Sequence, residues 1–241
     1  MKLSTLNHLI ELKKRILFCI LALIIFSCIS YFFAEEIFNF LITPLEKMAS
    51  KTYERKFIYT NLSEVFFSYI KLALFAGFIL TFPIMASQIY LFIAPGLYKK
   101  EKKTFLPFVI LSPMLFLLGG AFAYYVIFPL AWKFFLSFET VKETAIPILL
   151  EAKVSEYIAL VMSFIIAFGL AFQLPLLLLL LVSFNFIDRE WLIKKRKVAI
   201  VAIFIVAAII TPPDIISQIA LAIPMVILYE LSIMCCRYIK N

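Results

Sequence analysis

Charged residues, glycine, cysteine and histidine are all scarce in this chain. Its 241 residues include 5 Gly, 4 Cys and 1 His, and 64% of them are hydrophobic. Such an excess of apolar residues excludes an ordinary soluble domain and indicates a polytopic membrane protein.

The scarcity of cysteine and histidine excludes several kinds of site. Cys19 and Cys28 lie inside the first apolar run, and Cys235 and Cys236 lie near the C-terminus. None falls in a candidate external loop, which argues against a disulfide framework. The single histidine, His8, precedes the first span and is expected to be solvated or to cap a helix. No His, Cys, Asp and Glu cluster has ligand spacing, so neither a metal nor another cofactor is expected.

Uncharged runs long enough to cross about 30 Å of hydrocarbon occupy most of the chain. We therefore expect an all-α, integral membrane domain over residues 1–241, with six transmembrane helices of which the last two are short. The expected spans are residues 16–34, 66–95, 105–132, 157–185, 198–212 and 215–236. Neither a cleavable signal sequence nor a transit peptide precedes the first span, which favours a bacterial cytoplasmic (inner) membrane.

The 23 Lys and Arg residues are distributed unevenly between the two sides of such a topology. Four lie in the N-terminal segment, four in residues 99–103, five in residues 188–197 and two in the C-terminal tail. The other eight lie in or near two longer loops, about residues 35–64 and 133–156, that also hold nine acidic residues. The basic side is therefore predicted to be cytoplasmic, with both termini inside. The net charge of +8 reflects orientation in the membrane and not binding of nucleic acid.

The last two apolar runs are too short for ordinary spans. They contain sixteen and fifteen residues, which rise only about 24 Å each, several Å less than the hydrocarbon core. In the TPPD sequence between them, Pro212 and Pro213 end one helix and Asp214 is placed to cap the next. Either this hairpin thins the bilayer locally or it re-enters without reaching the far face. Two ordinary but short spans are the remaining alternative.

Two glutamates occupy lysine-rich segments beside the membrane. Glu11, in HLIELKKR, can pair with Arg15 on one face of a helix. Leu9 follows helical spacing on an adjoining face, so the segment is predicted to be an interfacial helix leading into the first span. Glu101 lies between lysines in APGLYKKEKKTFLP, which is interpreted as a cytoplasmic turn.

The two carboxylates have two interpretations. Adjacent lysines can neutralise them locally. Alternatively, they form a docking site for guanidinium groups, because arginine offers a planar fork that carboxylates bind bidentately. The lysines would then attract anionic lipid and hold the site at the level of the headgroups.

Five motifs carry a resemblance to a known family: HLIELKKR, LFIAPGLYKKEKK, AFAYYVIFPLAWKFF, AFGLAFQLP and TPPDIISQIALAIPMVILYE. In this order and spacing, over about residues 5–237, they resemble the TatC family. The resemblance implies the receptor subunit of the twin-arginine translocation system, which exports folded proteins using the proton-motive force. It also implies six spans in a cupped, glove-like arrangement, both termini in the cytoplasm, TatA- and TatB-like single-span partners, and a homo-oligomer within the complex.

The resemblance also assigns roles to particular residues. It implies that Glu11 and Glu101 bind the consecutive arginines of a signal peptide. The other residues expected in the same recognition region are Phe92, Leu9, Lys13 and Arg15. The polar residues expected to contact partners or to support the structure are Gln173, Asp214 and Gln218.

The chain departs from the family pattern at two of these positions. Lys13 stands where the family usually has arginine, which keeps the charge but loses the fork. Gln173 stands in the fourth span where the family usually has glutamate. Glutamine cannot titrate near neutral pH, so a proton-carrying role is excluded there, whereas a hydrogen bond to a partner helix remains possible. An unpaired amide at that depth would cost about 1–3 kcal/mol.

Two other classes of protein fit the sequence less well. A secondary transporter would need ionisable residues near the midplane, and the spans supply Gln173 but no acid; no internal repeat is evident either. An intramembrane hydrolase would need a histidine at the depth of a serine, and His8 lies outside the spans. The chain is therefore not expected to be an enzyme.

Overall fold

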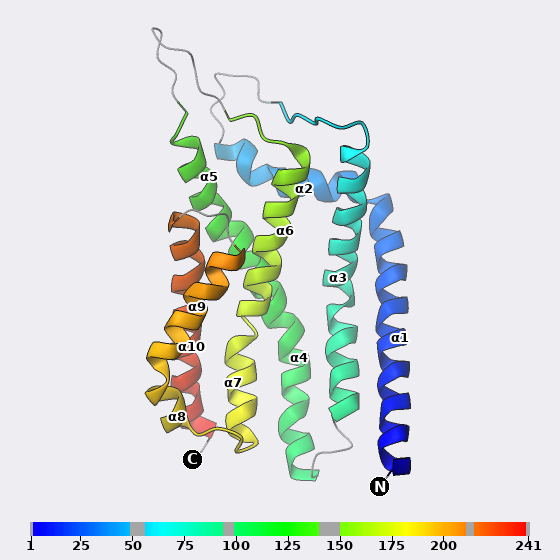
Figure 1. Cartoon of the computed structure of the whole chain (residues 1–241), viewed down its shortest axis with the longest axis vertical. Helices are drawn as coiled ribbons and strands as arrows, with labels where there is room; N and C mark the ends of the chain where they lie inside the picture. The colour runs from blue at the N-terminus through cyan, green and yellow to red at the C-terminus, as the bar shows by residue number, and fades with distance from the viewer. Residues whose placement is uncertain (1, 49–55, 94–98, 140–149, 211–214, 240–241) are drawn as a thin grey trace.

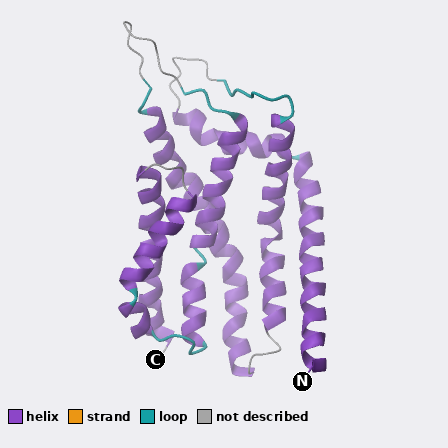
Figure 2. Ribbon diagram, in the orientation of Figure 1, coloured by secondary structure: helices purple, strands orange, loops and turns teal. Residues whose placement is uncertain are grey.

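The computed structural model describes residues 2–48, 56–93, 99–139, 150–210 and 215–239 (Figure 1). Apart from short connections and one isolated parallel bridge between Ile58 and Lys153, the described part is helical (Figure 2). The predicted all-α fold is confirmed. The elements are α1 (Lys2–Phe32), α2 (Ala34–Met48), α3 (Glu64–Ile93), α4 (Lys99–Phe122), the π-helix η2 (Ala123–Ile127), α5 (Phe128–Leu136), α6 (Val154–Ala171), α7 (Leu174–Ser183), α8 (Arg189–Lys194), α9 (Arg196–Ile210) and α10 (Ile215–Ile239).

Among the described residues, five helical stretches are long and apolar enough to cross a membrane. They are His8–Phe32, Glu64–Ile93, Phe105–Leu136, Val154–Ser183 and Gln218–Arg237. They match five of the six predicted spans, and α9 lies at the position of the other. Both ends of the chain lie at the same end of the molecule (Figure 1). We call this the basic end, because it carries the starts of α1 and α4 and all of α8; the opposite end, which carries α2, is the loop end.

The hairpin of α9 and α10 differs in part from the sequence prediction. The 15 residues of α9 make it short, as predicted. The end of α9 and the start of α10 lie below the level at which α3 and α6 begin (Figure 1). The prediction is wrong for α10, which extends over 25 residues. Glutamate is a good helix former, so Glu230 does not end the helix, and its carboxylate pairs with Arg196 of α9 at 2.7 Å. Asp214 and the prolines before it lie outside the described residues.

Residues 35–64 were predicted to form a loop, and this is wrong up to Met48. This part of the segment belongs to α2, a helix that lies across the loop end (Figure 1). Its apolar face is buried and its first turn carries two glutamates. Pro44 lies inside the helix, so it cannot donate a backbone hydrogen bond to the carbonyl of Phe40. The hydroxyl of Tyr124 replaces that donor, at 2.8 Å from the Phe40 oxygen. A side chain from η2 thus compensates the proline and ties α2 to the bundle.

Two close helix contacts organise the bundle. Between α1 and α3, a Cβ added at Gly77 would lie 2.3 Å from Ser27 Oγ. Between α4 and α6, a Cβ added at Gly119 would lie 2.4 Å from the carbonyl oxygen of Phe168. Membrane helices pack through small residues because no hydrophobic force drives apolar helices together in lipid. We refer to these contacts as the α1–α3 seam and the α4–α6 seam.

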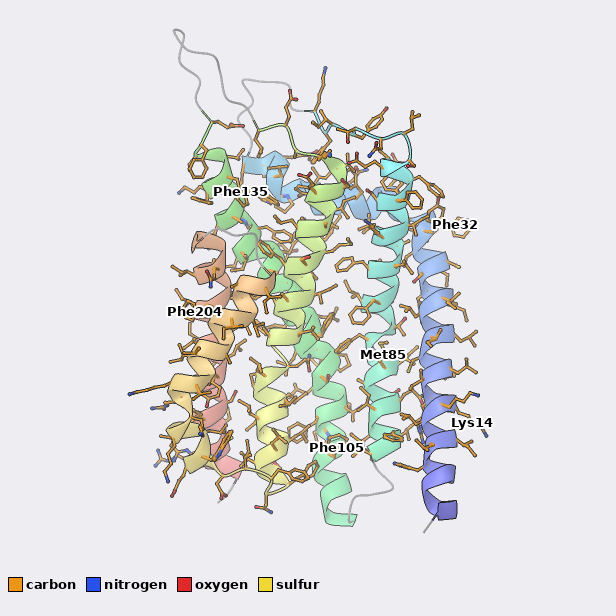
Figure 3. All side chains as sticks on the ribbon, in the orientation of Figure 1. Lys14, Phe32, Met85, Phe105, Phe135 and Phe204 are labelled. Atoms are coloured by element: carbon orange, nitrogen blue, oxygen red, sulfur yellow. The ribbon has the colours of Figure 1, made fainter. Side chains whose placement is uncertain are left out.

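Side chains fill the space between α4, α5 and α6, whereas α1 stands at the edge of the molecule. The largest fully buried side chains include Phe116, Phe128, Phe164 and Phe168. In contrast, Lys14 projects from the outer side of α1, as does Phe32 at the other end of that helix (Figure 3). The first helix therefore depends mainly on α3 for its position.

Candidate functional site

A carboxylate and a guanidinium group meet on α1 near the basic end. Arg15 donates from Nε to Oε1 of Glu11, at 3.2 Å, and from Nη2 to the same oxygen. The predicted Glu11–Arg15 pair is confirmed. Arg15 also donates from Nη1 to Oε1 of Gln88 on α3, at 3.3 Å. One guanidinium group therefore links the two helices of the α1–α3 seam.

A second contact joins the same two helices closer to their ends. The ring of His8 stacks on that of Phe92, with 4.5 Å between ring centroids and 20° between planes. His8 is exposed, as predicted, but it also packs against an aromatic ring. Phe92 lies one helical turn beyond Gln88 on α3, so both contacts occupy the same face.

Glu11 retains the capacity to accept a further donor. Both hydrogen bonds from Arg15 go to Oε1, and no donor among the described residues reaches Oε2. The side chain of Glu11 is 37% exposed, and that of Arg15 is 21% exposed. One carboxylate oxygen is therefore held in place by Arg15, while the other accepts no hydrogen bond from the described residues. A second guanidinium group could bind there without displacing Arg15.

Two other predicted site residues do not join this cluster. Leu9 is 62% exposed, and Lys13 is also exposed. Each lies two residues from Glu11 and therefore on the far side of the helix. The structure places both where a lipid or a partner can reach them, but away from the Glu11–Arg15 pair.

Glu101 lies at the same end of the molecule, in the first turn of α4. The lysine-rich segment was predicted to be a turn, and this is wrong from Lys99 onward, where α4 begins. Lysine and glutamate are good helix formers, and an acidic side chain is favourable in a first helical turn. The side chain of Glu101 is not among those that the structure describes.

Gln173 lies where α6 gives way to α7, and both its amide oxygen and its amide nitrogen are paired within the chain. Ser112 of α4 donates from Oγ to the Gln173 carbonyl oxygen, at 2.9 Å. Gln173 Nε2 in turn donates to the backbone carbonyl oxygen of Ser112, also at 2.9 Å. The amide is thus paired within the chain, and it ties the interruption between α6 and α7 to α4.

The remaining predicted polar residues lie near the α9–α10 hairpin. Gln218 donates from Nε2 to the carbonyl oxygen of Phe204, at 3.2 Å, and so links the two helices. Asp214 lies outside the described residues. No group of three or more His, Cys, Asp or Glu residues in the described part of the chain could hold a metal ion.

Gln88 is the residue of this site that the sequence analysis missed. It is a polar side chain near the end of an apolar helix, four residues before Phe92. That spacing places it on the face that carries Phe92. A search for polar residues one turn from the predicted recognition aromatic would have found it.

These features define the class of protein. The chain is a multi-pass, α-helical membrane protein with an ion-paired polar site at one end of its first long helices. A family model for the Sec-independent protein translocase protein TatC matches residues 7–224. The chain belongs to the TatC family, as its motifs predicted.

Relatives and solved structures agree with this assignment. The chain is 48% identical to the Sec-independent protein translocase protein TatC of Rickettsia prowazekii over 235 residues, which cover 98% of this chain and 93% of that protein. It is 44% identical to the protein of the same name from Magnetococcus marinus over 240 residues, covering 100% of this chain and 86% of that protein. A crystal structure of the twin-arginine translocase receptor TatC superposes with a TM-score of 0.83 and 37% identity, covering 97% of this chain and all of that one. The relatives are translocase components, so the family role is transport and not catalysis.

Proposed function

We propose that this chain is the receptor and core subunit of a twin-arginine translocase in a bacterial inner membrane. In this role it binds the twin-arginine signal peptides of folded cargo at the cytoplasmic face. The observation that carries the proposal is Glu11, whose Oε1 is held by Arg15 while Oε2 accepts no hydrogen bond from the described residues.

The two arginines of a signal peptide would bind two separate carboxylates. One guanidinium group pairs with Oε2 of Glu11, and the other pairs with Glu101, at the same end of the molecule. Charge-assisted hydrogen bonds of this kind are about twice as strong as neutral ones. The lysines around Glu101 concentrate anionic lipid and hold the site at headgroup level.

The stacked pair of His8 and Phe92 offers a flat aromatic surface beside Glu11. A guanidinium group stacks favourably on an aromatic face, and arginine is suited to this surface better than lysine. Phe92 is therefore assigned to recognition. The apolar part of the signal peptide follows along the concave wall of the bundle.

TatA- and TatB-like single-span proteins pack on the outer helices, near the α9–α10 hairpin and Gln173. The short α9 thins the bilayer locally and lowers the barrier to insertion of a signal hairpin. The proton-motive force drives transport, but Gln173 carries no proton. Several copies of the chain assemble in the complex.

Replacement of Glu101 tests the receptor role most directly. We expect Glu101→Ala to abolish photocrosslinking of a signal peptide with Arg-Arg to residues 94–107, because a guanidinium group loses its carboxylate. Membrane insertion and abundance should stay at the wild-type level. Crosslinking of the mutant at the wild-type level would show that the site assignment is wrong.

Two controls separate specific binding from general electrostatics. Glu156→Ala removes an exposed acid at the loop end, where Glu156 pairs only loosely with Lys153 at 3.8 Å, and should leave crosslinking unchanged. A Lys-Lys signal peptide keeps the charge without the fork and should crosslink poorly to the wild-type protein.

A further inference from the structure

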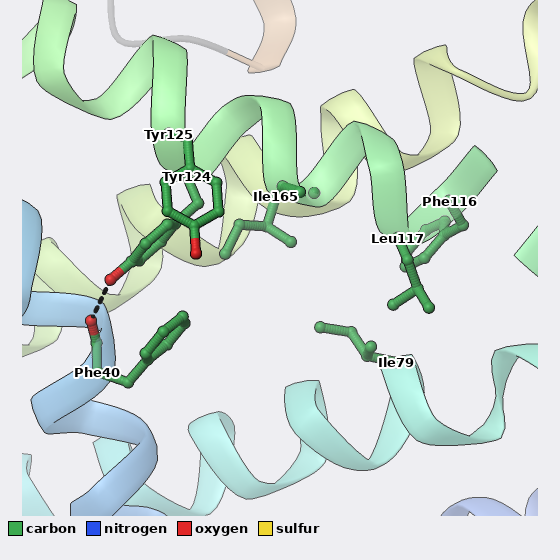
Figure 4. Close-up of a pocket in the computed structure, with 9 residues that line it drawn as sticks. Phe40, Ile79, Phe116, Leu117, Tyr124, Tyr125 and Ile165 are labelled. Carbon is green, nitrogen blue, oxygen red and sulfur yellow. Dashed lines mark hydrogen bonds between the residues drawn. The ribbon is translucent and has the colours of Figure 1, made fainter. Parts of the chain in front are cut away.

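Two adjoining hollows lie beneath α2 at the loop end and share Tyr124 and Tyr125 as lining residues. The larger hollow has a volume of about 330 Å³ and an almost entirely apolar wall. Its walls come from four α-helices and the π-helix η2, and Figure 4 shows Phe40, Ile79, Phe116 and Ile165 around it. Its lining is suited to a flexible apolar chain and includes no charged residue.

The smaller hollow has a volume of about 140 Å³ and a different character. Its lining includes Thr43 and Lys47 of α2 and Pro129 of α5. Lys47 is exposed, and no carboxylate within the described residues pairs with it. Lys133 is also exposed and lies one helical turn beyond Pro129, on the same face of α5. This end of the paired hollows is therefore cationic.

The boundary between the hollows is set by the π-helix η2. Tyr124 and Tyr125 belong to it and line both hollows, with their rings at 4.9 Å and nearly perpendicular. Tyr124 is buried and committed to the Phe40 carbonyl oxygen (Figure 4). Tyr125 is 70% exposed and stands at the opening to the surrounding membrane. Single π-turns inside α-helices frequently occur at functional sites.

An apolar hollow open to the bilayer does not stay empty, since its walls would lose their dispersion contacts. Lys47 and Lys133 favour a negatively charged group beside the smaller hollow. Lys133 lies near the end of the membrane span Phe105–Leu136, which includes α5. A molecule with an acyl chain and an anionic headgroup satisfies both requirements, because the chain fills the apolar hollow and the headgroup pairs with the lysines. We propose that the paired hollows bind one anionic phospholipid, with an acyl chain against Phe116 and Ile165 and the phosphate beside Lys47 and Lys133.

The proposal is tested with purified protein in phosphatidylcholine vesicles that contain a trace of phosphatidylglycerol with a diazirine in one acyl chain. After irradiation, mass spectrometry locates the labelled residues. We expect label on residues 116–125. Ala121→Leu fills the opening of the larger hollow from an exposed position and should reduce this label severalfold. Ala202→Leu, at an exposed position of α9, is the matched control and should leave it unchanged.

The lysines are tested in the same vesicles. Lys47→Ala should reduce labelling at residues 116–125 about fivefold, as loss of one headgroup contact predicts, and Lys133→Ala should reduce it further. A phosphatidylcholine probe with the same diazirine should label residues 116–125 of the wild-type protein only weakly. The expected level is that of the phosphatidylglycerol probe on the variant that carries both Lys47→Ala and Lys133→Ala. Equal labelling of wild type by the two probes would overturn the anionic preference. Unchanged labelling in Ala121→Leu would overturn the site, and would leave an apolar segment of a partner protein as the better occupant.

Discussion

The α1–α3 seam and the α4–α6 seam both rest on a glycine, but α1 and α6, one helix from each seam, are buried to very different degrees. In the most apolar part of α1, 17% of residues are buried, against 44% in the stretch formed by α6 and α7. The first helix therefore has one main neighbour, whereas α6 is enclosed on several sides. The Glu11 part of the proposed signal-peptide site lies on the weakly held helix α1. The geometry of this part of the site depends on the α1–α3 seam alone. The rest of the bundle does not depend on that seam.

The largest effect is expected at the enclosed seam. In Gly119→Ala the new Cβ would lie 2.4 Å from a backbone oxygen and 2.8 Å from a backbone carbon of Phe168, so α4 and α6 must move apart. Overpacking of this kind costs about 1–3 kcal/mol, and a backbone clash belongs at the upper end. Thermal unfolding in detergent, followed by circular dichroism, should show a clearly lower midpoint.

The neighbouring residue is the matched control for that change. At Gly120 a new Cβ would approach only the Ile165 side chain, at 3.2 Å, and alanine is favoured over glycine in a helix by about 1 kcal/mol. Gly120→Ala should therefore unfold at or near the wild-type temperature. Equal losses at both positions would mean that the seam is not the reason for the glycine.

A smaller effect, but one directed at the site, is expected at the other seam. In Gly77→Ala the new Cβ would lie 2.3 Å from Ser27 Oγ and 2.7 Å from the Ser27 backbone nitrogen, so α1 must shift away from α3. The shift disturbs the contacts of Arg15 with Gln88 and of His8 with Phe92. Signal-peptide crosslinking should fall about fivefold, which corresponds to about 1 kcal/mol.

Two results would contradict the distinction between the two seams. Gly77→Ala could leave crosslinking intact, or it could lower the unfolding midpoint as much as Gly119→Ala does. The first result would mean that α1 is positioned by something other than the seam. The second would mean that the edge helix is part of the cooperative core. Gly120→Ala again provides the control, with crosslinking unchanged.

Sequence reasoning succeeded where interactions are local. The pairing of Glu11 with Arg15 follows from their spacing in one helix, and the apolar runs located the long helices. It failed where partners are distant in sequence: nothing near Gln173 identifies Ser112, which lies 61 residues earlier. The helix α2 was missed because its charged residues were assigned to a loop, and the hydroxyl of Tyr124 that compensates for Pro44 lies 84 residues away from Phe40.

A third prediction concerns Gln173, which belongs to the α4–α6 side of the comparison. Gln173→Leu leaves the Ser112 hydroxyl and carbonyl without the amide and should destabilise the protein by about 1 kcal/mol, the usual size for such a bond in a membrane. If the amide also contacts a partner helix, co-purification of the TatB-like subunit should weaken. Ser112→Ala provides the control, because it removes one hydrogen bond to Gln173 and keeps the amide. If Gln173→Leu leaves recovery of the TatB-like subunit unchanged, Gln173 does not contact the partner helix.

The smallest effect is expected at Gln88, which affects the site only through Arg15. With Gln88→Leu, Nη1 of Arg15 loses its acceptor on α3, and the guanidinium group is free to occupy both oxygens of Glu11. A signal-peptide arginine must then compete for Oε2, so affinity should fall about twofold, the scale of an exposed ion pair.

Gln88→Glu reverses the argument, because a second carboxylate draws Arg15 toward α3 and leaves more of Glu11 accessible. Affinity for the signal peptide should then rise, as measured by titration of a labelled peptide against the detergent-solubilised protein. The two variants move the guanidinium group of Arg15 in opposite directions, and Gln88→Glu also adds one negative charge beside the site. If both weaken binding equally, Gln88 merely packs between the helices. If they shift affinity in opposite directions, Arg15 controls access to Glu11, and the α1–α3 seam sets the strength of the site as well as its position.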